Sequence, residues 1–223
     1  QPKAGGEDGW KFVTKVYLKF KGGYSTPTAA RGPMRTPEGV AKMTDENNDL
    51  IFYTNGSRVY AKDNSLVAHG LNGDTTQIQG VAILPKTTCK GCQAEYYIFT
   101  MRKNAAGENQ VYYSIYDRKL NGGKGGVSIK NQFLSPVPSA ERFGVAVSGG
   151  DYYWLQTQDA DSTILRTFKV SKAGIAAPIE SVAKTPVQGP SASSHFSRDG
   201  KVLAIAYVSP PSNQVDIYDF DVA

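Results

Sequence analysis

Residues 192–208 read A-S-S-H-F-S-R-D-G-K-V-L-A-I-A-Y-V, and this stretch decides the fold that we expect. The first five residues alternate in polarity, as one strand of a sheet does. Asp199-Gly200 then supplies the positive φ that a tight hairpin turn needs. Residues 202–208 follow as a nearly unbroken apolar run, which is typical of a strand covered on both faces. A strand, an Asp-containing turn and a hydrophobic strand are how a β-propeller blade begins.

The same pattern recurs along the chain, first in residues 40–54, V-A-K-M-T-D-E-N-N-D-L-I-F-Y-T. Repeats begin near residues 37, 77, 139 and 191, and their mean spacing of about 51 residues suits blades of four short strands. The expected strands are residues 39–43, 50–54, 58–62, 78–84, 95–101, 110–117, 143–147, 152–157, 163–170, 192–196, 202–207 and 214–219. The middle strand of each repeat carries aromatic residues, so we expect them to pack one blade on the next.

The fold class that this pattern predicts is all-β, a β-propeller of four-stranded blades with about four to five blades visible. The pattern stops directly after a strand, so we expect these blades to belong to a larger ring. The other interpretation is that the N-terminal strand near residues 12–20 closes a small ring. Residues 1–9 are predicted to be a loose N-terminal segment, residues 10–223 the propeller domain, and residues 22–37 a long Gly/Pro loop.

Composition narrows the classes of partner. The 25 basic and 20 acidic residues give a net charge of +5, but the basic residues are scattered through turns. Residues 11–21 are the one candidate for a nucleic-acid-binding stripe, and they read better as an alternating strand, so we expect no nucleic-acid partner. No apolar run is long enough to span a membrane. The chain starts at Gln1 without a leader segment, which indicates a mature form or a trimmed chain.

Two sets of motifs resemble known propellers. Residues 50–56, L-I-F-Y-T-N-G, and 81–86, V-A-I-L-P-K, resemble secreted propeller proteins of Bacteroidetes, which often carry type IX secretion sorting domains or are associated with gliding motility. Residues 196–204, F-S-R-D-G-K-V-L-A, are similar to the repeat of TolB-like and WD-repeat-like propellers, with Arg198 where Pro is usual. The resemblance covers residues 10–222. It implies export to the periplasm, the outer-membrane surface or the outside of the cell.

The motif with the clearest potential for redox chemistry, metal binding or a disulfide is Cys89-Lys90-Gly91-Cys92, which falls in an expected hairpin loop. A redox-active pair would favour a following helix, and none is expected there. A zinc site would need two more ligands, and the histidines, His69 and His195, are distant in sequence. For an exported chain with two cysteines we expect a disulfide that closes the loop, with metal and redox roles as alternatives.

His195, Ser197 and Asp199 invite comparison with a Ser-His-Asp triad. Asp199 belongs to the expected turn, however, and in WD-like repeats a strand His and a turn Asp often hydrogen-bond each other. We therefore assign His195, Ser197, Asp199 and Gly200 to the blade and its turn, with no catalytic, cofactor-binding or metal-ligating residue. Residues 159–162, D-A-D-S, resemble part of a calcium loop but are better explained as a solvated hairpin tip.

The sequence thus predicts an exported β-propeller that acts as a protein-binding scaffold in a bacterial cell-surface, secretion or gliding-motility assembly. We expect no enzymatic activity and no cofactor. The partner would be a protein of the cell surface or outer membrane, with a glycan as a second ligand class, bound at blade edges and loops such as residues 22–35 and 120–126. The alternative is a carbohydrate-binding or hydrolytic propeller, which would need acids from different blades to converge in the channel.

Overall fold

The computed structural model describes residues 16–19, 28–89, 91–148, 150–186, 192–207 and 213–221. Nearly all regular structure in these ranges is strand, with a single turn of 3-10 helix, η1 (Asn121–Gly123). The described part of the chain contains no helix with the length and apolarity that crossing a membrane requires. The all-β prediction is therefore confirmed. The expected loose segment 1–9 lies outside the described residues.

The described strands form a hairpin followed by four antiparallel sheets, in which each strand after the first pairs with the one before it except for β15, which pairs with β13. The hairpin is β1 (Val16–Lys19) with β2 (Thr28–Arg31). Sheet I holds β3 (Ala41–Thr44), β4 (Leu50–Thr54), β5 (Arg58–Ala61) and β6 (Leu66–His69), and sheet II holds β7 (Val81–Pro85), β8 (Glu95–Lys103), β9 (Asn109–Asp117) and β10 (Gly126–Ser135). Sheet III holds β11 (Gly144–Val147), β12 (Tyr152–Gln158), β13 (Ile164–Ser171), β14 (Gly174–Ile175) and β15 (Ile179–Val182), and sheet IV holds β16 (Ala192–Phe196), β17 (Val202–Tyr207) and β18 (Gln214–Asp219).

Short polar turns fix these hairpins. Between β4 and β5, the Asn55 side-chain oxygen accepts the backbone N–H groups of Ser57 at 3.1 Å and Arg58 at 2.9 Å, and Gly56 takes a φ of 83°. Between β3 and β4, Asp45 accepts the N–H group of Asp49 at 2.9 Å in the same manner. Because each Asx side chain satisfies backbone donors within its own turn, the turn forms locally and sets the register of the strands beside it.

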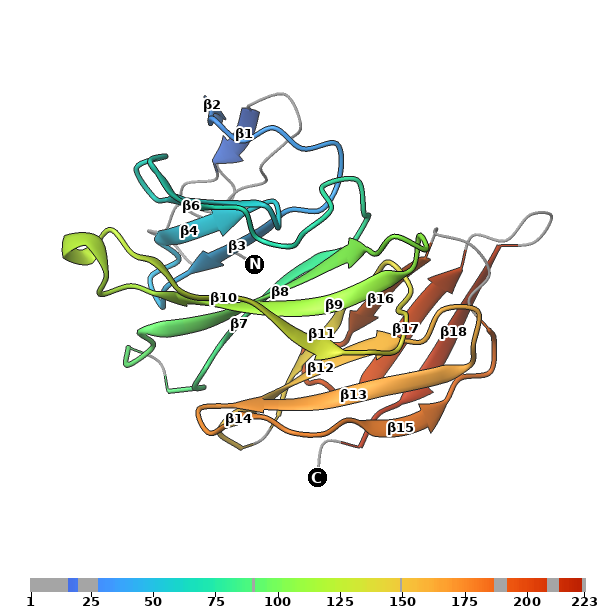
Figure 1. The fold of residues 1–223 in the computed structure, drawn as a ribbon. Coiled ribbons are helices and arrows are strands. Elements are labelled where there is room, and N and C mark those ends of the chain that lie inside the picture. Colours follow the sequence, from blue (N-terminus) through green and yellow to red (C-terminus); the bar gives the residue numbers. More distant parts are fainter. Residues whose placement is uncertain are drawn as a thin grey trace.

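In Figure 1, sheet I lies at the upper left, sheet II across the centre, sheet III at the bottom and sheet IV at the right. Their first strands are neighbours, since β3 contacts β7 and β11 contacts β16. A parallel bridge between Gln79 and Arg142 joins the segments that lead into β7 and β11. The first strands of successive sheets therefore lie together.

Aromatic residues seal the boundary between sheets I and II. The ring of Phe52 on β4 stacks on Tyr116 at 3.9 Å between centroids and meets Tyr96 on β8 edge-on at 5.5 Å. All three side chains are buried. The prediction that aromatics of neighbouring middle strands cover one another is confirmed at this boundary, because β4 and β8 are both the second strand of their sheet.

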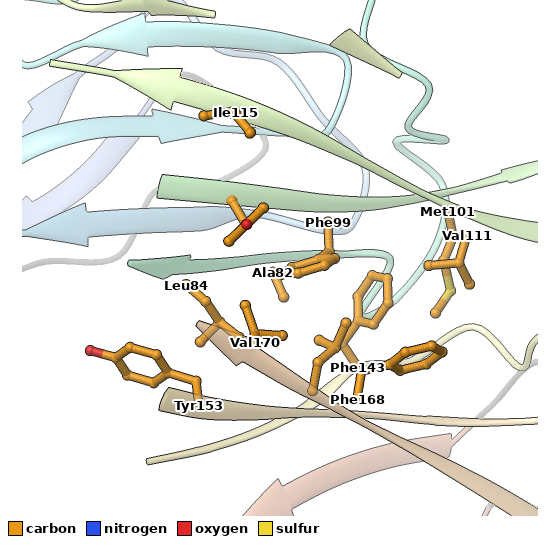
Figure 2. Close-up of a cluster of buried hydrophobic side chains, with 12 residues drawn as sticks. Ala82, Leu84, Phe99, Met101, Val111, Ile115, Phe143, Tyr153, Phe168 and Val170 are labelled. Carbon is orange, nitrogen blue, oxygen red and sulfur yellow. The ribbon is translucent and has the colours of Figure 1, made fainter. Parts of the chain in front are cut away.

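The boundary between sheets II and III holds a large cluster of buried apolar residues. Figure 2 shows Ala82 and Phe99 of sheet II facing Phe168 and Val170 of sheet III. Phe99 and Val170 have no exposed surface. Sheet II is thus covered on both faces, because sheet I occupies the other one.

Three expectations from the sequence were wrong. The segment of residues 22–37, expected to be a loop, contains β2, which pairs with β1. The run of residues 202–208 was expected to be covered on both faces, but β17 is buried only at alternate positions. The sequence pattern also missed β6, β10, β14 and β15, since these short or outer strands have many polar or exposed residues and show little apolar periodicity.

Candidate functional site

Two adjoining hollows lie along the first strands of the sheets. One, of about 380 Å³, takes lining residues from all four sheets or the segments leading into them, including Val40, Val81, Phe143 and His195. The other, of about 350 Å³, is lined from sheets I, II and III. Ile83 and Val145 line both hollows. We call the combined depression the inner-strand groove, with residues Met43, Val81, Ile83, Val145 and Val147 as its apolar wall.

The apolar wall is unusual for the open side of a strand. Val145 and Val147 project from the same face of β11, where they are 41% and 53% exposed. Ile83 of β7, across the groove, is only partly buried. An antiparallel strand with one solvated face normally places polar residues on that face. The open valines and isoleucine therefore indicate a surface suited to an apolar ligand.

Gln79 forms a polar end of the groove. Its side-chain oxygen accepts the N–H group of Ser194 at 2.9 Å, and its amide nitrogen lies 3.2 Å from Nε2 of His195. This contact joins the segment before β7 to β16, so it holds sheet II beside sheet IV. His195 was expected to bond to Asp199; the contact that the structure places on its ring is with Gln79 instead.

Ser197, Asp199 and Gly200 form the turn between β16 and β17. The Ser197 hydroxyl donates to the Asp199 carboxylate at 2.6 Å, and the Lys201 N–H group donates to the same oxygen at 3.2 Å. These bonds lower the pKa of Asp199, and Gly200 takes a φ of 74°. Because the Ser197 proton points to the carboxylate, the three side chains do not form a Ser-to-His-to-Asp relay.

Acidic residues stand at the other end of the groove. Asp45 and Glu46 both belong to the turn between β3 and β4. Asp45 accepts the N–H groups of Asn47 and Asp49 at 3.0 and 2.9 Å, which ties its carboxylate to its own turn. The phenol of Tyr153 borders the same hollow, and burial raises its pKa. The acids of this hollow thus come from a single sheet.

A buried polar layer supports the groove from behind. Arg142 is 1% exposed, donates through Nη2 to the Gln158 side-chain oxygen, and lies 5.2 Å from the centre of the Tyr207 ring. Burial lowers the pKa of this guanidinium. Ser194 donates to the Gln156 side-chain oxygen at 2.8 Å. This layer locks β16 against sheet III and so positions His195 at the groove.

Glycine at position 144 is needed for this close approach. A Cβ atom there would lie 2.8 Å from Oγ of Ser194 and 2.9 Å from Oε1 of Gln156. Such distances are shorter than a carbon and an oxygen tolerate, so a side chain at position 144 would displace the Ser194 and Gln156 side chains and disturb the hydrogen bond between them.

Cys89 and Cys92 form the predicted disulfide, in the exposed loop between β7 and β8. The same loop is fastened to sheet III through Asp151, whose carboxylate accepts the Thr88 N–H group at 2.7 Å and the Thr87 hydroxyl at 2.9 Å. These bonds lower the pKa of Asp151. Over the described ranges, no three His, Cys, Asp or Glu side chains gather as a metal site would require.

Asp159 corrects another expectation. It was assigned to a solvated hairpin tip, yet it is only 8% exposed and pairs with Arg166 at 2.7 Å. Arg166 also contacts Glu180 of β15 at 2.6 Å. This carboxylate therefore serves the packing of sheet III.

The sequence reasoning missed Gln79, Val145 and Val147. The available signal was the lack of polar alternation in V-A-I-L-P (Val81–Pro85) and G-V-A-V (Gly144–Val147), which was read as strand propensity only. No known protein-family model matches this sequence, and no curated protein matches it significantly.

Proposed function

We propose that sheets I to IV are blades of a β-propeller and that the protein is an exported, protein-binding scaffold of a bacterial cell-surface, secretion or gliding-motility assembly. Four successive antiparallel meanders with neighbouring first strands support the blade arrangement. The disulfide is compatible with an oxidising compartment. The resemblance of residues 50–56 and 196–204 to secreted propellers favours the lineage and the setting.

The observation that carries the proposal is the apolar wall of the inner-strand groove. An extended loop of a partner protein would cover Ile83, Val145 and Val147 with its own apolar side chains. Complete burial of one such side chain contributes roughly 1.5–3 kcal/mol. Two or three of them contribute about 3–9 kcal/mol before the costs of association and of ordering the loop are subtracted, so the apolar wall by itself supports weak, reversible binding.

A glycan-binding or hydrolytic propeller is the alternative. Hydrolysis of a glycosidic bond typically uses two carboxyl groups on opposite sides of that bond. The acids at the groove, Asp45 and Glu46, sit side by side on one turn, and Asp45 is engaged with backbone N–H groups. The facing wall offers valines and an isoleucine in place of hydrogen-bonding groups, which favours a protein segment over a sugar.

Site-specific photocrosslinking tests the proposal. A photoreactive phenylalanine at Val147 would be used on intact native cells, with the same residue at Ile129, an exposed position of β10, as the control. We expect a specific protein adduct from position 147 alone, and we expect Val145→Lys to abolish it.

Equal adducts from both positions would contradict the groove as the binding site. The glycan alternative would be favoured if purified protein bound or cleaved an oligosaccharide and Asp45→Asn with Glu46→Gln removed that property. An experimental structure with the four first strands spread away from a common axis would contradict the blade arrangement.

A further inference from the structure

Among the residues that the structure describes, strand β18 leaves one edge of sheet IV open. Sheets I and II have four strands and sheet III has five, whereas sheet IV has three. In the described part of the chain, β18 pairs with β17 and with nothing on its other side. All six residues of β18 keep a regular register with β17, without a bulge. The edge is therefore straight and continuous.

The hydrogen-bonding groups on this edge can be assigned. Phe220 donates its N–H group to the Lys201 carbonyl at 2.7 Å, across β17 and β18. In an antiparallel pair such bonded positions alternate, so every second residue of β18 directs its backbone toward β17. The intervening residues, Val215, Ile217 and Asp219, direct their N–H and C=O groups to the open side.

Other outer strands carry features that block strand addition. The pairing of β10 is interrupted at three places, and Asn131 within it takes a φ of 55°. Lys130 reaches back to the His69 carbonyl at 2.9 Å, which ties β10 to sheet I. Strand β15 is short and follows Pro178. Short strands, bulges, lysines and prolines are common protections of an edge, and β18 has none of these four; its inward-pointing charge, Asp216, is bonded within the strand by Gln214 and Tyr218.

An apolar face lies beside the open edge. Val215 and Ile217 are 61% and 63% exposed, and they pair with Ala206 and Ala204 of β17 on the same face. Asp219, also exposed, continues this row and ends it with a carboxylate. The outward row of β18 therefore reads apolar, apolar, acidic.

We propose that the β18 edge binds a β-strand of a partner protein, which adds antiparallel as the fourth strand of sheet IV. The incoming strand would place apolar side chains opposite Val215 and Ile217 and a Lys or Arg opposite Asp219. Its backbone bonds give affinity, and its alternate side chains give specificity. A second copy of this chain fits less well, because its outward row offers no cation to Asp219. This surface is separate from the inner-strand groove, since β17 lies between β18 and the groove-lining strand β16.

Fluorescence anisotropy with the labelled peptide Thr-Lys-Thr-Val-Thr-Val-Thr tests the proposal on the whole chain. Its Lys and Val residues share one face in the required order. The control peptide has Glu in place of Lys. We expect the Lys peptide to bind about twofold to fivefold more tightly, the range of a cross-strand charge pair. Asp219→Lys should reverse this preference, and Ile217→Lys should weaken both peptides.

Ile129→Lys, which changes an exposed isoleucine on the protected strand β10, is the matched control and should leave both affinities unchanged. Hydrogen exchange should slow at the amides of Val215, Ile217 and Asp219 when the Lys peptide is bound. Absent binding at millimolar peptide, equal affinity for both peptides, or no response to Asp219→Lys would overturn the proposal. So would a dimer in analytical ultracentrifugation that Ile217→Lys dissociates, because the occupant would then be a second copy.

Discussion

Sheets II and IV contain middle strands of similar apolar character, yet the structure treats them differently. In β8, residues Tyr96 to Met101 are buried without a break. In β17, burial alternates, so Leu203, Ile205 and Tyr207 are covered while the residues between them are not. Sheet II has a neighbour on each face and sheet IV has one described neighbour. An apolar run therefore permits burial on both faces, and the neighbouring sheets decide whether it occurs.

Side-chain size follows the same division. The open face of β17 carries Ala204 and Ala206, whereas both faces of β8 carry large aromatic or aliphatic residues. Small side chains limit the apolar area that an uncovered face presents to water. On the next strand, Val215 and Ile217 are large apolar side chains on an exposed face, which is why we propose that a partner binds at that edge.

The largest expected effect on stability comes from the second covered face of sheet II, which has no described counterpart in sheet IV. Phe99→Ala removes a fully buried ring that packs against Phe143 at 6.3 Å between centroids. The cavity and the lost transfer energy should lower the free energy of unfolding by about 3–5 kcal/mol. Urea denaturation followed by tryptophan fluorescence measures this. A loss under about 1 kcal/mol would show that sheet III does not cover sheet II as described.

Two isoleucines of sheet IV allow its covered face and its exposed face to be compared directly. Ile205 of β17 has no exposed surface, and Ile217 of β18 is 63% exposed. Ile205→Ala should cost about 2–5 kcal/mol, and Ile217→Ala should stay within about 0.5 kcal/mol, since only the first creates a cavity. The same denaturation experiment compares them. Similar losses for both variants would mean that the outer face is already covered in solution.

Loss of the disulfide should lower the free energy of unfolding less than Phe99→Ala or Ile205→Ala does. Cys89 and Cys92 are three positions apart, so the bond restricts only a very short loop of the unfolded chain. Replacing both by Ser should lower the free energy of unfolding by about 2 kcal/mol or less. Thermal denaturation of oxidised, reduced and Ser-substituted protein checks this value. Unfolding of the protein on reduction would instead show that the contact between sheets II and III depends on this loop.

The smallest effect concerns alkaline pH and the boundary of sheets I and II. Burial raises the pKa of Tyr116 to about 12. The folded protein holds this phenolic proton more tightly than the unfolded chain, whose tyrosines titrate near pH 10. The resulting stability is present below about pH 10 and is lost as the pH rises through the folded value.

Tyr116→Phe keeps the ring on Phe52 and removes the ionisable hydroxyl. The variant should therefore lose less stability than the parent between about pH 10 and 12. Tyr112→Phe, a change in a partly exposed ring of the same strand, is the control. Identical pH dependence of the parent and Tyr116→Phe would rule out Tyr116 as a source of the alkaline loss.

Much of the fold was predictable because it is local. The expected strands 50–54, 192–196, 202–207 and 214–219 agree with β4, β16, β17 and β18 at both ends. Asx turns and alternating polarity lie within a few residues of the strands they define, so a single sequence contains them. Strands such as β10 were missed because an outer strand needs little apolar surface and leaves a weak pattern.

The candidate groove was not predictable in the same way. Gln79 and His195 are 116 positions apart in the sequence and contact each other in the structure. Val145 lines a groove only because Ile83, on another sheet, lies across from it. None of these four residues lies in a local sequence pattern that distinguishes a groove from a core. The resemblance to WD-like repeats suggested a bond between His195 and Asp199; in the structure His195 contacts Gln79, and Asp199 accepts from Ser197 and Lys201.

By itself, the sequence determined an all-β chain, the turns that close its hairpins, its repeating strand units and the Cys89–Cys92 pairing. Only the tertiary structure decided which strand faces are covered, where the first strands meet to form a groove, and that β18 has no second partner strand among the described residues. Turn geometry depends on neighbours in sequence, whereas burial depends on which sheets come to lie side by side.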